Sequence, residues 1–381
     1  MGRNVDFGVF MPVTNNGWII SKTSPQFLPS FAHNRDIAQL AERIGFSYLF
    51  SMAKWRGFGG DVEFWKYSLE SMILMSGLAA SAPTMRLITS IAPALMHPAV
   101  FAKMAATMDD VAGGSRMGIN IVSAGNKGEY TQMAMYPDNF EAYRYDYNEE
   151  WVTVVKRLWA EASVTYKGRF FTLEDCISFP QPAEGGMPIV CATSSERGFQ
   201  FVAEHCTDGL FGGLTLEHQK QMSRRMKQVA VDRGRQVRSH TLVLLIQGDS
   251  DDDAERILRH YEAGADREAI ENIYRLRARD RADNRVDSYQ KRFESADSRL
   301  FYAGVPFVGG PERVADHIES LAIDGDLDGF LFIFPDFIEG LQRFSDQVMP
   351  LLRKRGLGRL TPPFTGVPTY ATPPAPRRAA G

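Results

Sequence analysis

The chain of 381 residues carries 43 Lys and Arg against 46 Asp and Glu, and 44% of its residues are hydrophobic. A formal net charge of −3 without a long basic run argues against a nucleic-acid-binding surface. An apolar run of about 18 residues, the minimum for a membrane span, is lacking, and three scattered cysteines (Cys176, Cys191, Cys206) indicate a reducing cytoplasm rather than a disulfide framework.

Strand-like apolar runs alternate with helical patterns along most of the chain. The strands are expected at 6–12, 47–51, 86–91, 117–123, 188–192, 208–211, 240–247 and 329–334. The helices are expected at 35–44, 64–80, 98–111, 140–161, 195–204, 216–233, 251–259 and 311–324. This alternation predicts an α/β fold, a (β/α)8 TIM barrel, which typically needs about 250 residues plus insertions.

The strands are continuously apolar, as in a parallel sheet covered on both faces. A doubly wound open sheet is the alternative. It is disfavoured because Gly57, Gly59 and Gly60 do not have the spacing of a dinucleotide-binding GxGxxG element.

We expect residues 1–355 to form one domain and 356–381 to form a proline-rich, flexible tail. Two insertions are predicted, a hairpin at 164–182 and a charged helical segment at 262–301 whose stretch 275–285 is a candidate lid. A strand that begins near residue 6 leaves no room for a signal peptide.

The segment from Ser51 to Gly60 is the first candidate for chemistry, because it follows a strand where TIM barrels carry their active sites. It contains two cations, Lys54 and Arg56, a tryptophan and three glycines. Met52 and Trp55 are therefore predicted to line a substrate pocket.

A second candidate lies at the end of the strand 117–123. Asn120 is an amide in an apolar strand, which costs about 1–3 kcal/mol unless it is hydrogen-bonded. The Asn120 side chain either forms a hydrogen bond with a neighbouring backbone or contacts a ligand, and we favour the ligand contact. The small polar residues that follow, Ser123, Gly125 and Asn126, would leave space for that ligand.

Two further segments could hold an anion. Arg144 and Tyr145 begin a long helical pattern, where Arg144 either pairs with Asp146 or Glu141 or clamps a phosphate. Ser195 lies between a strand and a helix, where it can cap the helix, and a helix N-terminus also binds phosphate.

Motifs for other chemistries are lacking. The chain has no histidine pair with metal-ligand spacing, so no metal is expected, and no GxSxG elbow. Phosphate-binding residues without an evident nucleophile indicate that a cofactor performs the chemistry.

With these residues in view, the chain resembles the bacterial luciferase-like flavin monooxygenases, and among them those that open the uracil ring with reduced FMN and oxygen. The resemblance extends from the N-terminus to about residue 350. It is dense at 15–18, at Ser51, Met52, Lys54 and 56–60, and at 63–65, 104–107, 144–147 and 181–182.

The resemblance implies a (β/α)8 barrel, O2 as co-substrate, and reduced FMN delivered by a separate NAD(P)H-dependent flavin reductase. It implies that the cofactor-binding residues are Ala53, Lys54, Asn120, Glu129, Arg144, Tyr145 and Ser195. On this interpretation Arg144, Tyr145 and Ser195 hold the phosphate and ribityl end, whereas Asn120 and Lys54 act as catalytic residues near the ring.

The chain departs from that pattern at two positions. Gly125 stands where the uracil-opening enzymes have a tryptophan, and Pro93 stands where they have a threonine. Loss of an indole enlarges the pocket, so we expect a larger planar nitrogen heterocycle, such as riboflavin, as the substrate.

Two other functions stay open at this point, a deazaflavin- or flavin-dependent oxidoreductase on the same barrel and a non-catalytic flavin-binding protein. A homo-oligomer is also expected, because the helical pattern 64–80 contains several methionines and leucines.

Overall fold

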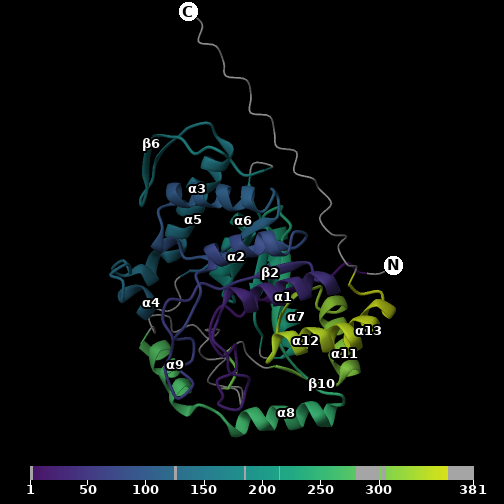
Figure 1. The fold of residues 1–381 in the computed structure, drawn as a ribbon. Helices are drawn as coiled ribbons and strands as arrows, with labels where there is room; N and C mark the ends of the chain where they lie inside the picture. The colour runs from purple at the N-terminus through teal and green to yellow at the C-terminus, as the bar shows by residue number, and fades with distance from the viewer. Residues whose placement is uncertain are drawn as a thin grey trace, which may run out of the picture.

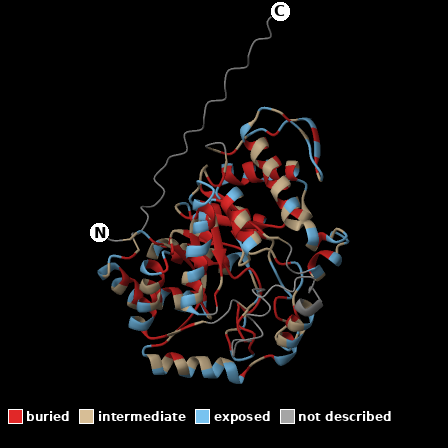
Figure 2. Cartoon of the chain, turned by 180° about the vertical axis from the view of Figure 1, so that it is seen from behind, coloured by how far each residue is buried: buried red, intermediate tan, exposed pale blue. Residues whose placement is uncertain are grey.

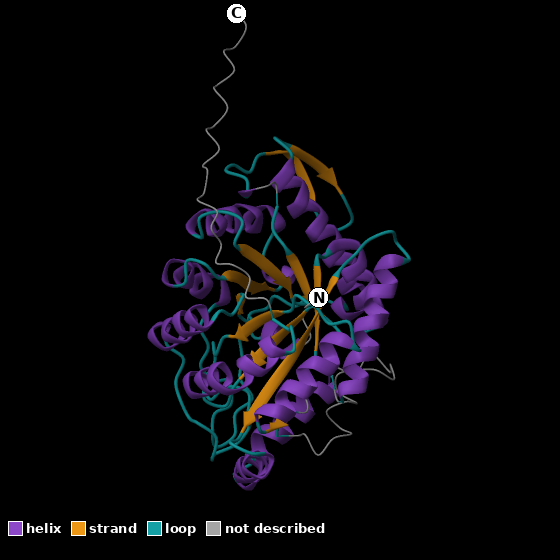
Figure 3. Cartoon of the chain, turned by 90° about the vertical axis from the view of Figure 1, so that its right-hand side faces the viewer, coloured by secondary structure: helices purple, strands orange, loops and turns teal. Residues whose placement is uncertain are grey.

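Parallel strand pairing runs from β1 around to β11, which pairs again with β1. The order is β1-β2-β3-β4-β7-β8-β9-β11, and the view along the barrel in Figure 3 shows these strands inside a ring of helices. A ninth strand, β10 (Phe307–Gly309), pairs with the far end of β9. The chain is therefore a closed (β/α)8 TIM barrel, and the doubly wound sheet is excluded.

The computed structural model describes residues 3–123, 127–183, 186–213, 215–279, 300–302 and 306–358, without the side chains of 277–279. The barrel strands are β1 Asp6–Phe10, β2 Tyr48–Phe50, β3 Arg86–Ile91, β4 Met117–Ile121, β7 Ile189–Ala192, β8 Asp208–Phe211, β9 Arg238–Gln247 and β11 Gly329–Ile333. Each overlaps a predicted strand. Strands such as β4 and β11 are buried at every residue, which explains their continuously apolar sequence.

The helices lie outside the barrel (Figure 1). They are α1 Phe31–Ile44, α2 Ser71–Ser81, α3 Pro98–Val111, α4 Lys127–Thr131, α5 Phe140–Ala160, α6 Glu196–His205, α7 Leu216–Val231, α8 Asp251–Ala263, α9 Arg267–Arg279, α11 Pro311–Ile323, α12 Phe337–Arg343 and α13 Met349–Lys354. Figure 2 shows buried residues concentrated in the strands and on the helix faces against them, while α8 exposes most of its surface.

The predicted helix at 64–80 is wrong in its first part, because α2 begins only at Ser71, where Glu70 caps it. Glu63 and Trp65 have positive φ values of 46° and 60°, which a helix does not allow. The indole of Trp65 packs instead against Trp18 and Tyr302, at centroid distances of 5.0 and 4.3 Å. Tertiary packing overrides the local helical pattern here.

The predicted insertions are partly described. The hairpin is confirmed as β5 (Val164–Lys167) and β6 (Thr172–Cys176), which pair antiparallel. The segment 262–301 contains α9, but 280–299, most of the candidate lid, lies outside the described residues, as do 359–381 of the tail. Within the described residues, no helix combines the length and apolarity needed to cross a membrane.

A buried polar layer closes the end of the barrel at which the strands begin. Tyr48 contacts His240, with 3.3 Å between Oη and Nδ1, and His240 Nε2 lies 2.8 Å from Asp208 Oδ1. Gly8 makes room for the tyrosine, since a Cβ there would lie 2.3 Å from the Tyr48 ring. This end is therefore filled with side chains, and a ligand has to enter from the carboxyl end of the strands.

Candidate active site

Lys54 lies in the loop after β2 and is buried, with its side chain 4% exposed. Its ammonium forms an ion pair with the carboxylate of Glu129 on α4 and lies 4.1 Å from the ring centroid of Phe58 and 5.3 Å from that of Trp65. Two residues far apart in sequence thus share one charge pair above the strand ends. The cation has a fixed position, held by one carboxylate and two rings.

Glu129 also fixes the neighbouring backbone. Its second carboxylate oxygen accepts a hydrogen bond of 2.9 Å from the Trp55 N–H. Met52 and Ala53, just before this pair, are half-buried, and Met52 packs against the core. The structure therefore brings Lys54 and Glu129 together, with Ala53 next to Lys54 in the chain, and the predicted cofactor contacts of these three residues stay a prediction.

Asn120 bridges three strands. Its Nδ2 donates to Ser90 Oγ on β3 at 2.8 Å, and its Oδ1 accepts from the Ala192 N–H on β7 at 3.2 Å. Ser90 Oγ donates in turn to the Ser51 carbonyl at 2.6 Å. The hydrogen bond expected between Asn120 and a neighbouring backbone is confirmed. The predicted contact of Asn120 with a ligand stays a prediction.

Ser90 was not predicted as a site residue. It carries the same signal as Asn120, a polar side chain near the end of an apolar strand, and that signal could have found it.

Tyr145 and Ser195 come together where β7 leads into α6. The Tyr145 hydroxyl lies 3.4 Å from Ser195 Oγ and 3.5 Å from Thr193 Oγ1. Ser195 caps α6 by accepting from the Gly198 N–H at 3.1 Å. The predicted cap is confirmed, and the N-terminus of α6 is placed beside Tyr145.

Arg144 is half-buried next to this group, with its guanidinium 5.5 Å from the Tyr145 ring centroid. It forms no hydrogen bond or ion pair with the residues that the structure describes. Of the two expected partners, Asp146 pairs with Arg197 and Glu141 pairs with Lys127. The simple ion-pair interpretation of Arg144 is therefore wrong.

The surroundings of Arg144 can hold an anion. Burial raises the pKa of the Cys191 thiol on β7 to about 12, and the nearby charge of Arg144 acts against this rise. A half-buried cation without a counter-ion among the described residues, beside two hydroxyls and a helix N-terminus, matches the chemistry of a phosphate ester. The residues present thus fit the phosphate of FMN.

A fully buried amide, also not predicted, joins α5 to the loop after β4. Asn148 Nδ2 donates to Ser123 Oγ at 2.9 Å, and its Oδ1 has no hydrogen-bond partner among the described residues. Ser123 is half-buried, whereas the other predicted pocket residues of this loop, Gly125 and Asn126, lie outside the described residues.

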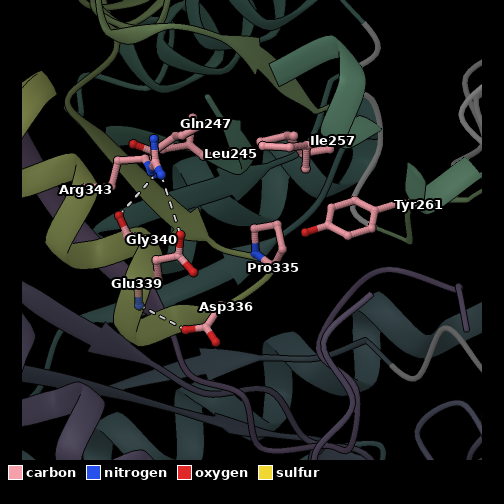
Figure 4. A pocket seen from close by; sticks show the side chains of 10 residues that line it. Leu245, Gln247, Ile257, Tyr261, Pro335, Asp336, Glu339, Gly340 and Arg343 are labelled. Carbon is pink, nitrogen blue, oxygen red and sulfur yellow. Dashed lines mark hydrogen bonds and ion pairs between the residues drawn. The ribbon is translucent and has the colours of Figure 1, made fainter. Parts of the chain in front are cut away.

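A separate pocket lies between β9, α8 and α12, shown in Figure 4. In many TIM barrels the loops after the last two strands bind phosphate. Here Asp336 caps α12 by accepting from the Glu339 N–H, and Arg343 is paired with Asp249 and Glu339. Carboxylates already occupy the positions that an anion would need, so this pocket does not suit a phosphate.

One described cluster has the composition of a metal site. Ligand atoms of Glu149, Glu204 and His205 lie within 4.8 Å of one another, but Glu149 is already ion-paired with Arg197 at 2.7 Å. This cluster is not among the predicted site residues.

The comparisons with known proteins cover nearly the whole chain. A family model described as luciferase-like monooxygenase matches residues 5–326. The chain is 37% identical over 355 residues to the pyrimidine monooxygenase RutA of Stutzerimonas stutzeri (strain A1501), covering 92% of this chain and 97% of the relative. It is 36% identical over 352 residues to the RutA of Acinetobacter baylyi, covering 91% and 95%.

Solved structures share the fold. The crystal structure of riboflavin lyase (RcaE), with modified FMN and riboflavin, aligns with a TM-score of 0.84 at 22% identity, covering 94% of this chain and 93% of that one. Long-chain alkane monooxygenase (LadA) aligns with a TM-score of 0.79 at 19% identity, with the same coverage.

Proposed function

The chain belongs to the luciferase-like monooxygenases, and from this membership we propose a two-component, FMN-dependent enzyme that uses reduced flavin and O2 to cleave a nitrogen heterocycle oxidatively. The similarity to pyrimidine monooxygenases over 92% of the chain supports a heterocyclic substrate. Reduced FMN, when bound, would supply the electrons that activate O2.

The observation that carries the cofactor assignment is the half-buried guanidinium of Arg144, which has no hydrogen-bond or ion-pair partner in the part of the chain that the structure describes. With Tyr145 and Ser195 it would bind the FMN phosphate and the ribityl end. Leaving such a cation without a counter-ion is unfavourable, and a phosphate would remove that cost.

The residues around Lys54 would face the reacting end of the ligand. The ammonium of Lys54 and the amide of Asn120 are hydrogen-bond donors that could stabilise a developing anion on the substrate. Ala53 and Glu129 would complete the cofactor contacts. Glu129 also holds the loop in place through the Trp55 N–H. Because these groups are fixed before the ligand binds, they need little rearrangement during the reaction.

The proposed substrate is a pyrimidine or a larger fused heterocycle such as riboflavin, bound near Met52, Trp55, Ser123, Gly125 and Asn126. Gly125 supports the larger ring, because a residue without a side chain occupies less of the pocket than an indole. Pro93, the second departure, is buried at the first position of the short 3-10 helix Pro93–Leu95, so it shapes the loop after β3.

We also propose an NAD(P)H-dependent flavin reductase as the partner, a cytoplasmic location and a homo-oligomer. The free cysteines Cys176, Cys191 and Cys206 agree with a reducing compartment. On α2, Met72 and Met75 are buried in the barrel packing, whereas Ile73 is 74% exposed and could serve a subunit contact.

The test is to titrate the purified protein with oxidised and with reduced FMN under anaerobic conditions. Oxygen uptake and product formation are then measured with a flavin reductase and either uracil or riboflavin. We expect tighter binding of reduced FMN and a product that requires O2. Binding without any product would favour the non-catalytic flavin protein, and activity with a deazaflavin alone would favour the other oxidoreductase.

A further inference from the structure

Trp55 exposes its side chain although Lys54 and Phe58 on the same loop are buried. The residue is 40% exposed, while Lys54 before it and Phe58 after it are 7% and 5% exposed. This exposed aromatic stands beside a buried charge pair in the loop after β2, at the end of the barrel where TIM barrels bind their substrates.

The N–H and the carbonyl of Trp55 both form hydrogen bonds with side chains on or directly after α4. The N–H donates to Glu129 Oε2 at 2.9 Å, and the carbonyl accepts from Gln132 Nε2 at 2.8 Å. Gln132 directly follows α4. The segment from Glu129 to Gln132 therefore fixes both the N–H and the carbonyl of Trp55. Through Glu129 it also fixes the Lys54 ammonium.

The loop is also fixed by the segment that precedes α2. Ser68 Oγ donates to the Lys54 carbonyl at 2.8 Å, and the Phe58 N–H donates to the Phe64 carbonyl at 2.8 Å. At Gly57 the two segments touch so closely that a Cβ would lie 2.5 Å from the Trp65 carbonyl carbon. A loop held by two separate segments therefore fixes the backbone of Trp55, which carries the exposed ring.

We infer that Trp55 is the surface on which the aromatic ring of the substrate stacks, and that Gln132 is the positioning residue that sets the orientation of this surface. The inference rests on the proposed function and narrows it to planar heteroaromatic substrates. A tryptophan whose backbone is fixed before binding loses little conformational entropy when a ligand stacks on it, because its side chain has only two rotatable bonds. An indole also overlaps a fused ring system more completely than a single ring, so the contribution grows with substrate size.

The experiment uses the full chain saturated with FMN and supplied with a flavin reductase. The variants are W55F, W55L, Q132L, Q132K and, as a matched control, Y67L, since Tyr67 is also an exposed aromatic at 44%. KM and kcat are measured with uracil and with riboflavin, and equilibrium dialysis measures the binding of each compound to the FMN-loaded protein. The Kd for FMN is measured separately for every variant.

We expect W55L to raise the dissociation constant and KM for riboflavin about tenfold, the scale of one base stacked on an aromatic side chain. The effect on uracil should be smaller, W55F should restore most of the binding, and Y67L should change nothing. Q132L should weaken riboflavin binding about threefold without changing the Kd for FMN, and Q132K, which keeps a donor for the Trp55 carbonyl, should restore it.

The inference would be overturned by unchanged riboflavin and uracil binding in W55L, by equal losses for both compounds, or by no binding of either compound to the wild-type protein. A loss of FMN binding in W55L would also overturn it, because Trp55 would then belong to the cofactor site. These outcomes differ from failure of the proposed function, in which the wild-type protein forms no O2-dependent product even when the heterocycle binds.

Discussion

Lys54 and Glu129 form a buried ion pair although 75 positions separate them in the sequence. The pair connects the loop after β2 to the helix after β4, two elements that do not adjoin in the barrel because β3 lies between them. This connection has a consequence for stability that can be measured.

Replacing Glu129 by Gln should destabilise the fold strongly. The ammonium of Lys54 would stay buried without its carboxylate, and breaking one side of a buried pair costs about 3–5 kcal/mol. Denaturant unfolding of E129Q measures this change. The exposed pair of Lys22 and Asp61 gives the control, since D61N should cost less than about 1 kcal/mol. Equal effects of the two variants would contradict the buried pair.

Replacing Arg144 by Ala should weaken FMN binding about tenfold or more, because a hydrogen bond to a charged group contributes about 1.5–3 kcal/mol. Fluorescence titration with FMN measures the effect. Arg169 is the control, because it lies near the same helix, is 64% exposed and is paired with Asp146. R169A should bind FMN like the wild type, and an R144A protein that does so as well would remove the phosphate assignment.

Replacing Asn120 by Leu should reduce both stability and turnover. The Ala192 N–H and the Ser90 hydroxyl would each lose a buried partner, at a cost of about 1–3 kcal/mol. S90A tests the role of orientation, since it leaves Asn120 in place but removes the acceptor of its Nδ2. We expect kcat to fall in S90A with little change in the Kd for FMN. An unchanged kcat in both variants would exclude Asn120 from the reaction.

Acid should unfold the protein partly through the closed end of the barrel. Burial raises the pKa of Asp6 and of Asp208, but Arg238 beside Asp6 and His240 beside Asp208 outweigh it, so both pKa values lie below the ordinary value. The stabilisation is complete above the unfolded-state pKa of about 3.9 and is lost as the pH falls through the lower folded-state pKa. Unfolding free energies measured below about pH 5 should therefore depend less on pH in D208N than in the wild type, and an identical dependence would contradict this.

Much of the barrel could be predicted from sequence for a simple physical reason. Parallel strands covered on both faces are apolar at most positions, so runs such as 188–192 and 329–334 are visible without any knowledge of the fold. The segment Phe64–Glu70 could not be predicted in this way. Its conformation depends on Trp65 packing against Trp18 and Tyr302, which belong to distant parts of the chain.

The candidate site, too, has features that local sequence patterns predict and features that only contacts between distant segments decide. Lys54, Asn120, Arg144 and Ser195 could be selected as residues that follow strands or begin helices, because the position of a polar side chain relative to a strand end is a local property. Their partners are set by barrel closure, which decides that Lys54 meets Glu129 and that Arg144 meets no carboxylate among the described residues. The sequence by itself determined the strands, the barrel and most of the candidate residues, since these depend on short-range patterns of polarity. Only the tertiary structure decided which charges are paired, which cation lacks a counter-ion among the described residues and how the backbone of the exposed Trp55 is held, since these depend on contacts between segments that the fold alone brings together.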